Sequence, residues 1–187
     1  LQCGSHLPLD KESSETLIRR GEQPTPIRHN CSGKHTGMLA FAKARGLPLD
    51  NYLEPAHPIQ QDILKTFSEM CQISIDKIGI GTDGCSAPNF SIPLYNTALG
   101  FARLCDPQEL PEKRADACKT ITSSMMAHPE MVSGFGRFDT RLMQVGRGKL
   151  VAKTGAEGYQ AVGILPDLTE ASPKGVGIAL KISDGDP

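Results

Sequence analysis

The 187-residue chain lacks any apolar run that approaches the roughly 20 residues of a membrane-spanning helix. It also lacks a basic cluster, because its 20 basic and 21 acidic residues are spread along the chain and leave a net charge of −1. Nucleic acids and anionic membranes attract proteins through basic stripes, and this sequence has none. We therefore expect partners that are neither nucleic acids nor membranes.

The first residues, LQCGSHLPLDKESSE, lack the charged stretch followed by an apolar stretch that marks a secretory signal peptide. The six cysteines include no CxxC pair; Cys31 and Cys85 lie in Gly- and Ser-rich motifs, and Cys71 and Cys118 lie within helical patterns. A chain with 39% hydrophobic residues can bury a core without disulfide bonds. We predict reduced thiols and a cytoplasmic protein.

Hydrophobic spacing predicts helices along most of the chain and strands at its end. The predicted helices cover residues 12–21, 33–45, 58–72, 92–105 and 139–148, with one more between 106 and 129. A short strand precedes a Gly-rich loop at 83–88, and three strands follow at 149–155, 158–165 and 174–182. Helices followed by strands indicate an α+β fold, an antiparallel sheet with packed helices. Because the chain starts without a cap or strand and stops just after a strand-like run, we expect one domain over 1–187, incomplete at both ends.

The motif HNCSGKHTG places Cys31 and Lys34 three residues apart at the start of a predicted helix. The helix dipole and the free N–H groups at such a start stabilise a thiolate, and a nearby ammonium adds to this effect. At this spacing both side chains project toward one face of the helix. The alternative is an ordinary helix start with an unreactive cysteine.

A second motif, GTDGCSAPNF, brackets Asp83 with glycines and adds Cys85 on the same loop. In extended chain, Asp83 and Cys85 point the same way, although a plain surface turn would look similar. Thiolates of Cys31 and Cys85, with Asp83 or a histidine, would make a zinc site, but the spacing is not that of a zinc finger. Lys34 would be a rare ligand, since its amine must first lose a proton.

The third motif is Lys153-Thr154-Gly155, at the end of a predicted strand. It is similar to the third signature of the serine β-lactamase and penicillin-binding fold, where the Lys sits beside the nucleophile. The alternative is an exposed strand lysine with no catalytic role. In that fold the nucleophile comes as Ser-x-x-Lys at a helix start, where this chain offers Cys31-x-x-Lys34.

The segments HNCSGKHTGML, GTDGCSAPNFSIPL and KTGAEGYQAVGI occur in this order, with LQCGSH before them and GIALKISDGD after them. Together they resemble the Rhizobium-type, or thermolabile, L-asparaginase II family over nearly the whole chain. The resemblance implies a fold like that of serine β-lactamases and glutaminases. It also implies hydrolysis of L-asparagine to L-aspartate and ammonia through a Ser–Lys acyl-enzyme.

The resemblance further implies roles for particular residues. Cys31, Lys34 and Cys85 match residues expected to hold zinc near the substrate pocket, with Asp83 beside them. Bound zinc would either anchor the substrate's α-amino or carboxylate group or fix the two loops together. Lys153 matches the catalytic Lys that partners a serine nucleophile, and Thr154 and Gly155 are expected near the substrate.

Residues 1–29 match neither of the family's nucleophilic serine elements, so we expect these elements, and a final helix, outside a partial asparaginase-like domain. Two alternatives stay open. One is an amidohydrolase with Cys31 as nucleophile and Lys34 as base. The other is a catalytically inactive fragment stabilised by zinc. The expected partner is the small substrate L-asparagine, with a homodimer as the candidate assembly.

Overall fold

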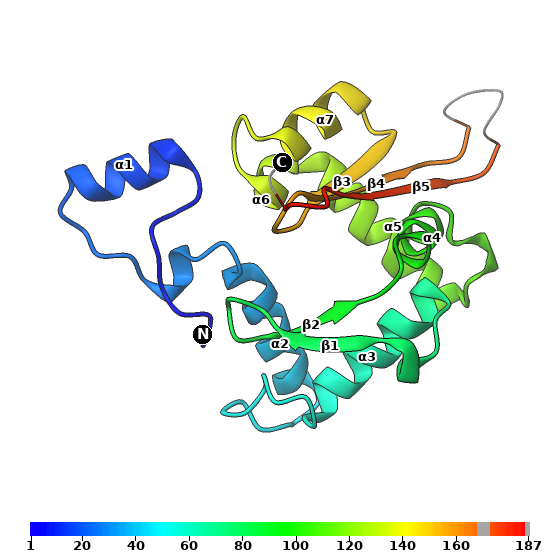
Figure 1. Ribbon diagram of the computed structural model, residues 1–187, viewed down its shortest axis with the longest axis horizontal. Helices are drawn as coiled ribbons and strands as arrows, with labels where there is room; N and C mark the ends of the chain where they lie inside the picture. The colour runs from blue at the N-terminus through cyan, green and yellow to red at the C-terminus, as the bar shows by residue number, and fades with distance from the viewer. Residues whose placement is uncertain (168–172, 186–187) are drawn as a thin grey trace. The chain divides into compact units, whose positions relative to one another are not determined.

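The computed structural model describes residues 1–167 and 173–185 of the chain (Figure 1). The chain divides into two compact units. Unit 1 comprises Leu1–Phe67 and Ile75–Ser91, and unit 2 comprises Ser68–Ser74 and Ile92–Pro187. The predicted single partial domain over 1–187 stays a prediction. The last two residues of the C-terminal segment GIALKISDGDP lie outside the described residues.

Unit 1 is mainly helical. Its elements are α1 (Lys11–Arg19), η1 (Pro26–Arg28), α2 (Ser32–Ala44), most of α3 (Pro58–Cys71), η2 (Ile75–Lys77), β1 (Gly79–Thr82) and β2 (Pro88–Ser91). The Asp10 carboxylate begins α1 by accepting a hydrogen bond from the Ser13 amide at 2.8 Å, a standard N-cap. The two strands form an antiparallel hairpin with Gly79 opposite Ser91 and Thr82 opposite Pro88. The sequence predicted β1 but not β2.

Two small apolar clusters form the core of unit 1. One contains Ala42, Tyr52 and Ile59, and the other contains Cys3, Cys85 and Ala87. The side chains of Met38 and Leu53 pack against both clusters. A cysteine of the predicted metal motif is therefore also a core residue.

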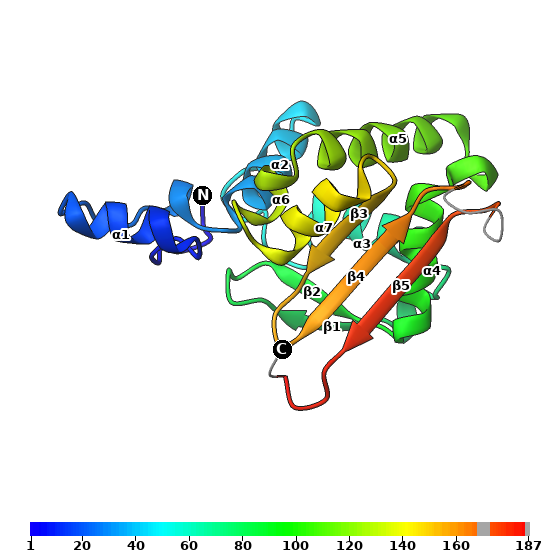
Figure 2. The same cartoon turned by 90° about the horizontal axis from the view of Figure 1, so that it is seen from above.

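Unit 2 contains the main sheet. Its helices are α4 (Leu94–Cys105), η3 (Pro107–Glu109), α5 (Glu112–Ala127), α6 (Pro129–Ser133) and α7 (Phe138–Gly146). Its strands are β3 (Leu150–Thr154), β4 (Tyr159–Ile164) and β5 (Val176–Lys181), antiparallel in the order β3-β4-β5. Figure 2 shows this sheet face-on. The predicted α+β class is confirmed, whereas the likeness to serine β-lactamases stays a prediction.

Helices lie on both faces of the sheet, but β5 is covered on one face only: Val176, Ile178 and Leu180, on its other face, are exposed. Helix α4 packs on β4 and β5, and α7 lies on the opposite face against β3 (Figure 1). The core joins Cys105 of α4 and Met143 of α7 to Val151 and Ala152 of β3. Successive strand residues point to opposite faces, so β3 is buried on both.

Helix α4 approaches the sheet closely at two glycines. A Cβ on Gly177 would overlap the carbonyl oxygen of Ala98, and a Cβ on Gly163 would overlap the Cys105 sulfur. These two glycines lie opposite each other on β4 and β5. They form the flat surface on which the helix backbone rests.

Among the helices of the described residues, none has both the length and the apolar character needed to cross a membrane.

Candidate functional site

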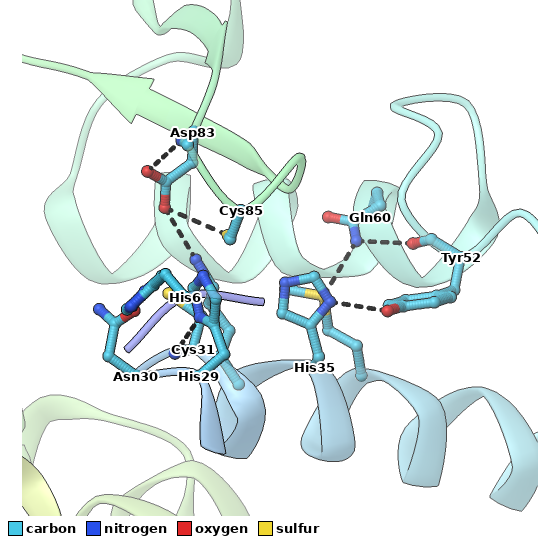
Figure 3. A network of polar contacts seen from close by, with 12 residues as sticks. His6, His29, Asn30, Cys31, His35, Tyr52, Gln60, Asp83 and Cys85 are labelled. Carbon is cyan, nitrogen blue, oxygen red and sulfur yellow. Dashed lines mark hydrogen bonds and ion pairs between the residues drawn. The ribbon is translucent and has the colours of Figure 1, made fainter. Parts of the chain in front are cut away.

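Three potential metal ligands meet in unit 1 (Figure 3). Cys31 is the residue directly before α2, and Asp83 and Cys85 belong to the turn between β1 and β2. The Cys85 sulfur lies 3.4 Å from Asp83 Oδ2, and the ligand atoms of all three residues lie within 4.8 Å of one another. We call Cys31, Asp83 and Cys85 the thiol–carboxylate cluster.

The β1–β2 turn has a defined backbone that places its side chains. The Asp83 amide donates to the Ala87 carbonyl at 2.9 Å, and the Ser86 amide donates to the Asp83 carbonyl at 2.8 Å. Ser86 has a left-handed conformation with φ of 68°. The Gly84 amide donates to Asp83 Oδ1 at 2.7 Å, which leaves Oδ2 free to face Cys85 and Lys34. The turn thus returns Cys85 toward the Asp83 carboxylate.

Lys34, on the first turn of α2, pairs with this carboxylate: its Nζ lies 3.0 Å from Asp83 Oδ2. Burial acts to lower the pKa of Lys34, but hydrogen bonds to Asp83 and Cys85 outweigh it and raise the pKa above its ordinary value. Burial conversely acts to raise the pKa of Asp83, while the bond to Lys34 and its charge bring that pKa below its ordinary value. The pair is therefore an ammonium and a carboxylate.

The Cys31 thiol departs from the sequence interpretation. Burial raises its pKa above the ordinary value, and Cys85 raises it further, although the Lys34 charge acts in the opposite direction. The sequence suggested that the helix start and Lys34 would stabilise a thiolate; the Lys34 charge does lower the pKa of Cys31, but burial outweighs it in the metal-free protein. The helix-dipole effect is worth only about 0.3–1 kcal/mol at such a position. Burial is the larger effect here.

The donor set fits a metal ion. Two cysteine sulfurs and one carboxylate oxygen are ligands that zinc accepts, and the soft sulfurs disfavour magnesium or calcium. Cys31, Asp83 and Cys85 could hold such an ion. From the sequence we expected Lys34 to be the third metal ligand, with Asp83 beside it. The structure brings all four residues together and bonds Lys34 to Asp83, and the role of Lys34 at a metal stays a prediction.

Histidine 29 supports the start of α2. The ring nitrogen Nδ1 of His29 accepts a hydrogen bond from the Cys31 amide at 2.9 Å. Burial, followed by the neighbouring His6, lowers the pKa of His29, so its ring is a neutral acceptor. This bond fixes the backbone of Cys31, the N-cap residue of α2, whose own side chain makes no capping hydrogen bond.

His35, one turn after Cys31, is fully buried. Its Nδ1 lies 2.6 Å from the Tyr52 hydroxyl, which also accepts a hydrogen bond from the Gln2 amide at 3.0 Å. Its Nε2 is buried without a hydrogen-bond partner among the residues the structure describes. Sequence reasoning noted the histidines that flank the motif but gave them no role; their spacing of two before and four after Cys31 was the available signal.

The Lys153-Thr154-Gly155 motif ends strand β3 in unit 2, as predicted. The Lys153 side chain is exposed, and its Nζ donates to the Thr154 carbonyl. A Cβ on Gly155 would come within 2.6 Å of the Tyr159 ring, so a larger residue there would have to displace this side chain. The Gly155 amide donates to the Tyr159 carbonyl at 2.9 Å and closes the turn.

A buried carboxylate fixes this strand end. Asp139, in the first turn of α7, is fully buried. It accepts hydrogen bonds from the Thr154 amide at 2.7 Å, the Thr154 hydroxyl at 2.8 Å and the Gln160 side chain at 3.0 Å. Thr154 is therefore held while Lys153, next to it, faces solvent. Sequence reasoning missed Asp139, because no motif links a helical aspartate to a strand fifteen residues later.

The predicted site residues thus form two groups. Cys31, Lys34, Asp83 and Cys85 lie together in unit 1, and Lys153, Thr154 and Gly155 lie together in unit 2. Among curated proteins, none gives a significant match to the chain. The family model for L-asparaginase II matches residues 1–187, which is the whole chain. The chain therefore belongs to the L-asparaginase II family.

Proposed function

We propose that the protein hydrolyses L-asparagine to L-aspartate and ammonia through a Ser–Lys acyl-enzyme mechanism. The observation that carries this proposal is the family match over the whole chain, which supports an amidohydrolase with a small amide substrate. The Lys-Thr-Gly strand adds support, because it presents an exposed amine beside a firmly held backbone.

Lys153 is the proposed proton acceptor. Amide hydrolysis needs a nucleophile, a base that activates it and an acid for the leaving ammonia. A neutral Lys153 amine would take the proton of a serine hydroxyl, and the resulting ammonium would then protonate the leaving nitrogen. Thr154 and Gly155 would border the substrate, since they flank Lys153 at the strand end. Asp139 acts through Thr154 and is a positioning residue.

The nucleophilic serine is proposed to come from a Ser-x-x-Lys element of the family that residues 1–29 do not match. The sequence contains one such spacing, Ser74 to Lys77, at the short helix η2, where both residues are exposed. It offers a matched control for the serine assignment. Cys31 is the weaker candidate, because burial raises its pKa and favours the unreactive thiol.

Zinc is the proposed metal at the thiol–carboxylate cluster. Cys31 and Cys85 would bind it as thiolates, with Asp83 or Lys34 as third ligand. A bound zinc ion would anchor a polar group of the substrate or hold the start of α2 to the β1–β2 turn. The choice of third ligand matters chemically, because Lys34 must release both its proton and Asp83 before it can bind a metal.

Ammonia release from L-asparagine, measured with the purified protein, tests the proposal. Lys153→Met should lower kcat by about 10²–10⁴-fold, the usual contribution of a positioned general base. Lys149→Met removes another exposed lysine directly before β3 and should leave kcat unchanged. Ser74→Ala should also be neutral.

Four results would contradict these assignments. Near wild-type turnover by Lys153→Met rejects the role of Lys153. Loss of turnover in Ser74→Ala would identify Ser74, directly before η2, as the nucleophile. Robust turnover by residues 1–187 alone that is abolished by Cys31→Ala, with metal removed, assigns the reaction to Cys31. Ammonia release from another small amide but not from L-asparagine would refute the assignment of L-asparagine as the substrate.

A further inference from the structure

Unit 2 contains a cavity of about 340 Å³ that none of the predicted site residues borders. The end of α3, the last turn of α4 and the start of α5 line it. Its polar lining consists of Glu69, Gln72, Arg103 and Arg114, and three apolar residues complete the wall. Its volume lies within the roughly 300–1,000 Å³ typical of small-molecule sites.

The two guanidinium groups in the cavity differ in their partners. Arg114 is paired: its Nη2 lies 3.0 Å from the Glu69 carboxylate. Arg103 Nε is buried and has no hydrogen-bond partner in the part of the chain that the structure describes. The polar lining therefore carries two positive charges and one negative charge, and the unmatched charge is that of Arg103.

Among the residues that the structure describes, Arg103 forms no ion pair. The nearest acidic residue along the chain is Asp106, directly after α4, whose Oδ2 accepts a hydrogen bond from the Gly175 amide at 3.0 Å and whose Oδ1 is buried without a hydrogen-bond partner. The thiols of Cys71 and Cys118 lie close enough to feel the Arg103 charge, but burial raises the pKa of both, that of Cys71 to about 11. Both thiols are therefore uncharged near neutral pH.

A partly buried guanidinium without an anion is costly, since burial removes water without supplying a replacement. Its N–H groups form a planar fork that matches the paired oxygens of a carboxylate or a phosphate. Arg114 stands across the same cavity, and the Gln72 amide can donate a further hydrogen bond. We propose that this cavity binds a small oxyanion, with Arg103 as its main ligand and Arg114 and Gln72 as supporting donors.

Glu69 sets the affinity of this site. It competes with the incoming anion for Arg114 and adds negative charge to the wall. Removal of the Glu69 charge should therefore strengthen anion binding, whereas removal of the Arg103 charge should weaken it. Opposite responses from two residues of one cavity distinguish a built site from general attraction to a basic surface.

Calorimetric titration of the protein at constant ionic strength tests the proposal. Inorganic phosphate in one arm and L-aspartate in the other distinguish the two sources of oxyanion, and chloride is the control for non-specific salt effects. We expect saturable binding of one oxyanion in the millimolar range or tighter. Arg103→Gln should weaken it at least about tenfold, because hydrogen bonds from charged groups are the strong ones.

Glu69→Gln should tighten binding severalfold, and Lys113→Gln, which removes an exposed charge of α5 outside the cavity, should change nothing. Circular dichroism establishes that each variant is folded. If Arg103→Gln does not fold, the tighter oxyanion binding expected of Glu69→Gln tests the proposal by itself. No saturable binding of either oxyanion by the wild-type protein would overturn the proposal. Equal binding by folded wild-type and Arg103→Gln protein would also overturn it, as would weaker binding by Glu69→Gln. L-aspartate is also the product of the proposed hydrolysis, and the responses of the Arg103 and Glu69 variants separate binding in this cavity from binding at the active site. The outcome therefore does not depend on the proposed hydrolysis.

Discussion

The two units hold their candidate groups by different physical means. In unit 1, the thiol–carboxylate cluster lies where a helix start meets a hairpin turn, and Cys85 is itself part of the small core. In unit 2, the Lys-Thr-Gly strand β3 is buried on both faces, and a buried carboxylate holds its end. A site built from core thiols couples metal binding to folding. A site built on a packed strand is already in place without a ligand.

Zinc should therefore stabilise unit 1 and leave unit 2 unchanged, which is the largest expected effect. A ligand at 1,000 times its Kd adds about 4 kcal/mol to the free energy of unfolding. Hydrogen exchange of metal-free and zinc-loaded protein, resolved by peptide, would show slower exchange in α2 and the β1–β2 hairpin only. Cys85→Ser should lose this protection.

The matched control is Cys118→Ser, which changes a buried thiol of α5 in unit 2. It should keep both the bound zinc and the protection of unit 1. Loss of one thiolate ligand should weaken zinc binding about tenfold or more, since even residues behind the ligands contribute that much. Equal zinc content in Cys85→Ser and wild-type protein, by elemental analysis, would refute the ligand assignment.

The buried carboxylate of unit 2 gives the next largest expected effect. Asp139→Ala leaves the Thr154 amide, the Thr154 hydroxyl and the Gln160 amide without their acceptor. Because unsatisfied buried donors are costly, we expect a loss of about 3 kcal/mol in the free energy of urea unfolding. Asp116→Ala, at an exposed ion pair with Lys119 on α5, should change it by less than about 0.5 kcal/mol. A loss no greater than that of the control would show that Thr154 is held by other means.

Alkaline pH should lower the stability of unit 2 by a smaller amount per pH unit, through Cys105. Burial, followed by the neighbouring Cys118 and Asp106, raises the pKa of Cys105 from 9.0 to about 12. Between these pH values the unfolded chain releases the thiol proton while folded unit 2 retains it. The contribution of Cys105 to the stability of unit 2 is thus complete below pH 9 and falls as pH rises toward 12, by about 1 kcal/mol per pH unit.

Urea unfolding at a series of pH values above 9, for wild-type protein and Cys105→Ala, measures this slope. The variant should show a shallower decline, because its unfolded chain has one proton fewer to release. Parallel curves for the two proteins would mean that Cys105 contributes nothing to alkaline unfolding.

Local patterns predicted most of the fold. Amphipathic spacing placed the helix at 58–72 against the observed α3 of Pro58–Cys71, and the strand at 158–165 against β4 of Tyr159–Ile164. Strand β2 was missed, because Pro88 and Asn89 are poor strand formers. Its backbone is held instead by pairing with β1, from Gly79 opposite Ser91 onward. Pairing of this kind depends on the partner strand and not on the strand's own composition.

The candidate site also has one part that short sequence patterns predict and another part that they do not. The closeness of Cys31 and Lys34 follows from one helical turn, and that of Asp83 and Cys85 follows from one tight turn. The support of Thr154 by Asp139 depends on how α7 packs against β3, which no short motif encodes. The raised pKa of Cys31 likewise depends on burial, a property of the folded unit.

The close approach of α4 to the sheet also restricts which substitutions this sequence can accept during evolution. At Gly177 a single added methyl group would occupy the space of the Ala98 carbonyl oxygen, a backbone atom that no rotamer change can move aside. A side chain at position 177 is therefore compatible only with a second change that lifts the helix from the strand. A substitution at position 177 without the second change would disrupt the packing of α4 on β5. Position 177 and the path of α4 should consequently change together or not at all.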